Sequence, residues 1–103
     1  MKEPKTVVDF LNHSIDIFEQ RDEEYGSNYK DAGKVLDILF PCGINICGEV
    51  EMTRFGLFRN CLNKLMRYSK NFEKGGHEDS LTDLRTYSAM LSEIDKENNM
   101  EIF

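Results

Sequence analysis

Apolar residues recur at steps of three and four along most of this 103-residue chain, which is the period of an amphipathic α-helix. Proline and glycine interrupt the pattern three times, so it predicts four helices. Their expected bounds are residues 6–24, 29–40, 50–72 and, from a start at 79 or 80, to 96. Four helices joined by short loops indicate the all-α class and, more specifically, a four-helix up-and-down bundle.

A chain of this length forms one domain. We expect a single helical domain over residues 1–103, with its core at about 6–96 and a frayed tail at 97–103. The helix expected at 50–72 is apolar on two sides, so it should lie at the centre. The apolar faces outnumber what so short a chain covers by itself. The sequence therefore predicts a homo-oligomer, either a dimer or a higher assembly.

The charge balance narrows the class of ligand. Nineteen acidic and thirteen basic residues give a net charge of −6, which argues against binding duplex nucleic acid through electrostatics. A small nucleotide remains compatible, because its charge can be met locally or through a divalent cation. No apolar run approaches the ~20 residues that span a bilayer. Three cysteines and no recognisable secretory signal indicate a reducing compartment, the cytoplasm.

Two pairs of carboxylates have helical spacing. Asp79 and Asp83 lie four apart, as do Glu19 and Glu23, so each pair shares one face of its helix. If these helices pack side by side, four carboxylates converge, and such oxygens suit Mg²⁺ that also binds a phosphate. The structural alternative is that Ser80 and Asp83 form a helix-capping box and the glutamates are solvated surface charges.

Lys64 falls inside an apolar stripe, between Cys61 and Tyr68, where a lysine needs a partner or a route to water for its amine. Arg67 follows one turn later. Together they form a polar strip that can bind phosphate oxygens, with arginine offering a bidentate fork. The equally weighted alternative is that Lys64 and Arg67 pair with Asp79 and Asp83 to satisfy buried charge.

Three further residues are candidates for the wall of a ligand pocket. His77 follows two glycines and can ligate a metal, donate to a phosphate or cap a helix. Tyr25 can stack on a base or pack in the core, and Tyr87 continues the line of the two aspartates. The chain has no P-loop, no G-x-G-x-x-G after a strand and no nucleophile elbow.

Three segments resemble a group of small phage and prophage proteins: RDEEYGSNYKDAGKV, LFRNCLNKLMRYSKN and GGHEDSLTDLRTYSAML. The second carries K-x-x-R and the third carries H-x-D-S-L-x-D-x-x-x-Y. This order of motifs resembles the all-α NTP pyrophosphatases of the MazG-like and dUTPase-like superfamily. The resemblance spans about residues 8–95, nearly the whole chain.

The resemblance implies an oligomeric helical bundle, in the host cytoplasm if the chain is phage-encoded, that hydrolyses a (d)NTP with the help of Mg²⁺. The implied metal-side acids are Glu19, Glu23, Asp79 and Asp83, with Glu23 and Asp83 as catalytic candidates. Lys64 and Arg67 would bind phosphates, and the pocket would be lined by Tyr25, His77 and Tyr87. The acids here are spaced differently from the MazG-like motifs E-E-x-x-E and E-x-x-D. The alternative is therefore a non-catalytic module that sequesters a nucleotide, or a cyclic nucleotide immune signal, without a metal. A third interpretation is an interaction protein with no ligand.

Overall fold

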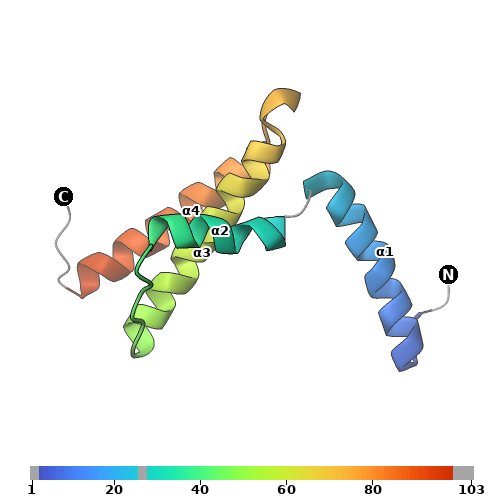
Figure 1. Cartoon of the computed structure of the whole chain (residues 1–103), viewed down its shortest axis with the longest axis horizontal. Coiled ribbons are helices and arrows are strands. Elements are labelled where there is room, and N and C mark those ends of the chain that lie inside the picture. The colour runs from blue at the N-terminus through green and yellow to red at the C-terminus, as the bar shows by residue number, and fades with distance from the viewer. Residues whose placement is uncertain (1–2, 26–27, 99–103) are drawn as a thin grey trace.

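The computed structural model describes residues 3–25 and 28–98, and the side chains of all of these except residues 23–25 and 28. Its elements are α1 (Val7–Tyr25), α2 (Asn28–Leu39), α3 (Glu49–Lys70), the 3₁₀ turn η1 (Phe72–Lys74) and α4 (Glu78–Glu97) (Figure 1). Every regular element among the described residues is helical. The predicted all-α class and its four helices are therefore confirmed, with bounds within two residues of those expected.

An antiparallel pair of helices, α3 and α4, forms the centre of the structure (Figure 1). A short turn connects them, in which Gly75 and Gly76 have φ angles of 99° and 93°. Only glycine adopts such angles without strain. A β-carbon on Gly76 would also lie 3.2 Å from the Tyr68 ring. The two glycines thus bring the start of α4 directly beside the last turns of α3.

The third packed helix, α2, crosses α3 (Figure 1). Ala32 of α2 and Leu62 of α3 are the buried apolar residues of the described part of the chain, at 5% and 8% exposure. At the end of α2, the ring of Phe40 lies 5.6 Å from that of Phe58 and 6.4 Å from that of Phe55, measured between centroids. Such tilted and edge-to-face pairs are the favoured arrangements of aromatic rings. The aromatic cluster fixes α2 to the first half of α3.

The first helix stands apart from the other three (Figure 1). Its apolar stripe is mostly open to solvent, and the edge-to-face contact of Phe18 with Tyr29, 6.1 Å between ring centroids, joins it to α2. Within the described residues of one chain, α2, α3 and α4 pack together, whereas α1 does not lie along them. None of the described helices is long and apolar enough to cross a membrane.

The start of α1 is stabilised by a cap that Thr6 and Asp9 form together. The Asp9 amide donates to Thr6 Oγ1 at 3.1 Å, and the amides of Lys5 and Thr6 donate to Asp9 Oδ2 at 3.2 and 3.3 Å. The hydrogen bond from the Lys5 backbone, followed by those from Thr6, holds the pKa of Asp9 below its ordinary value of 3.8. These hydrogen bonds favour the ionised carboxylate, so α1 is more stable when Asp9 is ionised than when it is protonated.

This cap gives α1 a testable pH dependence. Because the folded pKa of Asp9 is lowered, its stabilisation of α1 is complete above pH 3.8 and is lost as pH falls through the lowered pKa. We expect the helical circular dichroism signal of the wild type to fall more steeply below that pH than the signal of Asp9→Asn. Parallel curves for the two proteins would contradict the cap.

Candidate functional site

The seam between α3 and α4 holds an ion pair between two of the candidate site residues. Lys64 Nζ lies 3.0 Å from Asp83 Oδ2, and the lysine side chain is only 16% exposed while the aspartate is 48% exposed. The pairing alternative is thus confirmed for Lys64 and Asp83. The phosphate-binding alternative stays a prediction, and the carboxylate beside the amine is half open to solvent.

Further cations follow Lys64 toward the end of α3. Arg67, one turn later, is half-buried, and its backbone carbonyl accepts from Asn71 Nδ2 at 2.9 Å. Lys70 Nζ lies 3.8 Å from Asp31 Oδ2 of α2. Three basic side chains at steps of three therefore occupy the C-terminal half of α3, close to where α4 begins.

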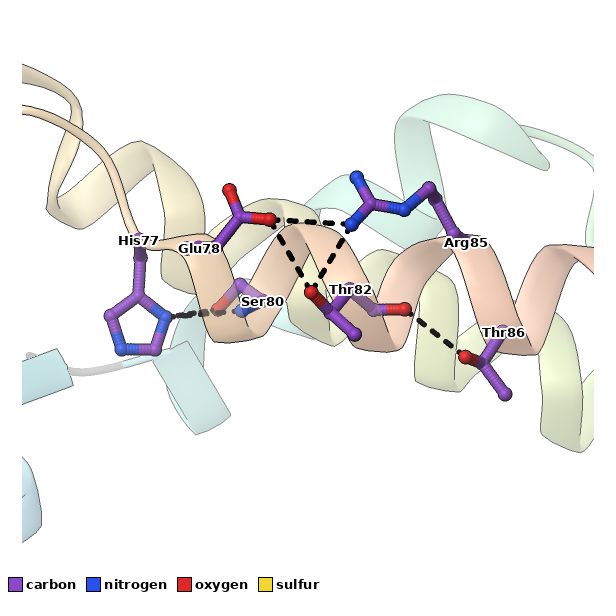
Figure 2. A network of polar contacts seen from close by, with 6 residues as sticks. All are labelled: His77, Glu78, Ser80, Thr82, Arg85 and Thr86. Atoms are coloured by element: carbon purple, nitrogen blue, oxygen red, sulfur yellow. Dashed lines mark hydrogen bonds and ion pairs between the residues drawn. The ribbon is translucent and has the colours of Figure 1, made fainter.

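His77 caps α4 at the same end of the seam (Figure 2). Its Nδ1 accepts from the Ser80 amide at 3.3 Å and lies 2.6 Å from Ser80 Oγ, and Ser80 is buried. The proposed Ser80–Asp83 capping box is thus wrong. The glycines before His77 place it in an extended conformation (φ −150°, ψ 96°) that suits a cap, so Ser80 becomes its partner. Asp83 is then left to pair with Lys64.

The outer side of the first turns of α4 carries a polar network (Figure 2). Arg85 Nη2 lies 3.2 Å from both Glu78 Oε1 and Thr82 Oγ1, and Thr86 Oγ1 donates to the Thr82 carbonyl at 3.1 Å. The charged side chains of Glu78 and Arg85 are about three-quarters and two-thirds exposed. Exposed pairs of this kind contribute about 0.2–1 kcal/mol each, so the network supports the helix without forming a site.

Among the described residues of one chain, the acids expected around a metal are not gathered at one place. Asp79 lies in the first turn of α4 and is exposed, one turn before Asp83. Glu19 is exposed on α1, apart from the seam (Figure 1). The side chains of Glu23 and Tyr25 lie outside the described part of the chain. Among the described residues, no three His, Cys, Asp or Glu side chains are placed to hold a metal ion. Tyr87, half-buried, follows Asp83 by one turn.

A separate pocket of about 290 Å³ lies between the loop after α2, the first half of α3 and the end of α4. Its walls include the cluster of Phe40, Phe55 and Phe58. Arg54 and Asp95 also line the pocket, and Arg54 Nε donates to Asp95 Oδ1 at 2.7 Å. The helical pattern indicates these phenylalanines only as core residues. The partners of the Arg54–Asp95 ion pair are 41 positions apart, so no local spacing in the sequence indicates it.

The three cysteines are free thiols. Cys42 and Cys47 are exposed in the loop before α3, whereas burial raises the pKa of the Cys61 thiol above its ordinary value of 9.0. Cys61 therefore belongs to the packed side of α3 beside Lys64. A raised pKa lowers the fraction of the reactive thiolate form at neutral pH.

No protein-family model, curated protein or solved structure matches this chain. A function must therefore be argued from the chemistry of the seam itself, with its partly buried lysine, its half-open aspartate and its neighbouring arginine.

Proposed function

We propose that this chain binds the phosphates of a nucleotide at the α3–α4 seam and, as a MazG-like protein, hydrolyses a (d)NTP to a nucleoside monophosphate and pyrophosphate. The observation that carries the proposal is Lys64, whose side chain is only 16% exposed and whose amine lies 3.0 Å from the half-exposed carboxylate of Asp83. A cation on a largely buried side chain is already positioned, so an incoming anion loses less conformational entropy in binding it than in binding a free surface lysine.

The seam offers the groups that a nucleotide phosphate requires. Lys64 supplies a point charge, and Arg67 one turn later supplies a planar fork that matches two phosphate oxygens. Tyr87 lies on the helix that carries Asp83, His77 caps the start of that helix, and both can line the same site. The phosphates of a nucleotide that enters beside the solvent-exposed part of Asp83 would therefore contact both Lys64 and Arg67.

Hydrolysis requires a water oxygen to attack the α-phosphorus while the α–β phosphoanhydride bond breaks and pyrophosphate leaves. Asp83 can orient this water and accept its proton, and Glu23 is the second candidate for the role. The oxygens of Asp79 and Asp83, one turn apart on α4, are ligands of the type that Mg²⁺ prefers. Bound there, Mg²⁺ would neutralise phosphate charge and lower the pKa of the attacking water.

One observation favours a second candidate function, nucleotide sequestration without turnover. Asp83 is engaged by Lys64, and no third acid in the described part of the chain joins Asp79 and Asp83. A site with few free carboxylates can hold phosphate through its cations alone. The ligand would then be a nucleotide or a cyclic nucleotide signal, and its binding would not depend on Mg²⁺.

Incubation of the purified chain with pooled dNTPs and Mg²⁺ tests the proposal. We expect pyrophosphate to be released and the release to stop when EDTA is added. If no product forms and calorimetry shows nucleotide or cyclic nucleotide binding that survives EDTA, sequestration is correct and hydrolysis is wrong. If no nucleotide raises the melting temperature or binds in calorimetry, both functions are wrong and the chain is an interaction protein.

A further inference from the structure

The chain exposes far more surface than a compact protein of its mass. Its accessible surface is 8339 Å², whereas a folded monomer of 12.0 kDa exposes roughly 6,000 Å². Its radius of gyration is 17.3 Å, against roughly 13 Å for a compact domain of this length. Two chains that each covered the excess would bury roughly 4,600 Å², within the 2,000–5,000 Å² range of obligate dimers.

Much of the uncovered apolar surface lies on α1. Val8, Leu11, Ile15 and Phe18 are each more than half exposed. Their spacing of three, four and three residues forms a single seam along the helix, of the kind that packs against another helix. A helix of 19 residues with such a seam gains most of its stability from packing. We therefore expect α1 to be covered in solution.

A surface that suits this seam lies at the end of α3. Leu65 on α3 and Phe72 on η1 are 51% and 68% exposed. Beside them runs an open groove lined by Tyr68, Ser69, Lys70, Phe72, Glu73 and Lys74. This surface combines exposed apolar side chains with Lys70, Lys74 and the acidic Glu73, whereas α1 has an apolar seam with acidic residues along one side.

The charges of the two helices are complementary. α1 carries six acidic residues and one basic residue, a net charge of −5. α3 carries five basic residues and two acidic residues, a net charge of +3. Two α1 helices side by side would repel each other, and an anionic membrane surface would repel α1 as well. Lys70 and Lys74, which line the groove, are the basic side chains of this surface that can face the acidic side of α1.

We propose that two copies of this chain exchange their α1 helices. The apolar seam of α1 from one copy packs against Leu65, Phe72 and the adjacent groove of the other copy, and the exchange is reciprocal. The acidic flank of α1, including Asp16 and Glu19, then faces the basic half of α3. This partner accounts for the excess surface, the open seam and the opposite charges together.

The exchange also has a consequence for the seam between α3 and α4. A helix that brings Glu19 toward Lys64 and Arg67 supplies acids that the described part of one chain does not gather there by itself. A complete site would then contain α1 of one copy with α3 and α4 of the other. This consequence rests on the proposed function, whereas the exchange itself does not.

The mass of the full-length chain in solution tests the exchange without any nucleotide. Light scattering after gel filtration should give twice the chain mass of 12.0 kDa, or a higher even multiple. Ile15→Asp, in the seam, should reduce the mass to that of one chain. Gln20→Asp adds the same charge on the opposite side of α1 and should leave the dimer intact. A monomeric wild type, or a dimer that survives Ile15→Asp, overturns the proposal.

Charge reversal distinguishes exchange from a fold-back of α1 onto its own chain. Asp16→Lys with Glu19→Lys in one protein, and Lys70→Glu with Lys74→Glu in another, should each give monomers. Mixing the two proteins should restore the dimer, because each interface then joins opposite charges. The exchange is wrong if the mixture stays monomeric and only a single chain with all four substitutions associates. It is also wrong if neither the mixture nor that chain associates. Since no nucleotide is present, a failure of the proposed function leaves these outcomes unchanged.

Discussion

Replacing Lys64 by methionine should lower the affinity for nucleotide by roughly ten- to a hundredfold. A hydrogen bond to a charged group contributes about 1.5–3 kcal/mol, and each 1.4 kcal/mol is a factor of ten in affinity. Methionine keeps the long apolar stem that packs in the stripe of α3, so the change removes the amine and little else. Isothermal titration calorimetry with the nucleotide that binds the wild type measures the loss.

The same substitution should have only a small effect on stability. Asp83, the partner of Lys64, is 48% exposed and can be solvated when the amine is removed. Loss of such a screened pair lowers the free energy of unfolding by about 1 kcal/mol or less. The melting temperature should therefore fall by no more than about 4–8 °C. A large fall in stability with unchanged affinity would show that Lys64 serves packing and that the seam does not bind phosphate.

Lys34→Met provides a matched control. It removes the same charge from α2, where the lysine side chain is 81% exposed and lies 3.9 Å from Asp31. Both variants lower the net charge of the chain equally, so a non-specific electrostatic effect would weaken nucleotide binding in both. We expect the affinity of Lys34→Met to equal that of the wild type.

The helices could be predicted, and an ion pair of Lys64 with an acid of the last helix is one of two equally weighted alternatives, because both depend on local patterns. Apolar steps of three and four predict helix bounds within two residues of those observed. A lysine inside an apolar stripe requires a partner, and an acid on the facing helix is the obvious one. These inferences need only the period of the helix and the cost of burying charge.

The cap of α4 could not be predicted from residue types alone. Both His77 and Ser80 can accept the amide hydrogen bonds of a helix start, and the Ser80–Asp83 spacing fits a capping box. The outcome depends on the backbone of the Gly75–Gly76 turn, which places His77 in the extended conformation that a cap needs. With the cap at Ser80, Asp83 would complete a capping box. With the cap at His77, three residues earlier, Asp83 pairs with Lys64.

The position of the acidic residues of α1 relative to the seam depends on tertiary packing. The spacing of residues within one helix carries no information about that packing. Glu19 and Asp83 can share a site only if their helices lie side by side, and in one chain α1 stands apart. The Arg54–Asp95 pair escapes prediction for a related reason, since its partners come from the start of α3 and the end of α4. Helical periodicity does not predict contacts between segments that are distant in the sequence, or contacts between copies of the chain.

Asp83→Asn should lower the rate of pyrophosphate release by about 10²–10⁴-fold, because an amide cannot accept the proton of the attacking water. The same change removes a negative charge beside Lys64, so nucleotide affinity measured without Mg²⁺ should be unchanged or higher. Asp37→Asn, the same chemical change at an exposed position of α2, serves as the control and should leave turnover unchanged. Kinetics at saturating nucleotide and calorimetry separate the two effects.

This split between rate and affinity distinguishes the two proposed functions. If the chain hydrolyses nucleotides, Asp83 acts mainly in the reaction, and its loss gives a protein that binds substrate without converting it. If the chain only sequesters nucleotides, the wild type has no turnover and Asp83 competes with the ligand for Lys64. Asp83→Asn then raises the affinity for nucleotide. Turnover that persists in Asp83→Asn would show that the proton acceptor and the metal-side acids lie elsewhere, whatever the oligomeric state.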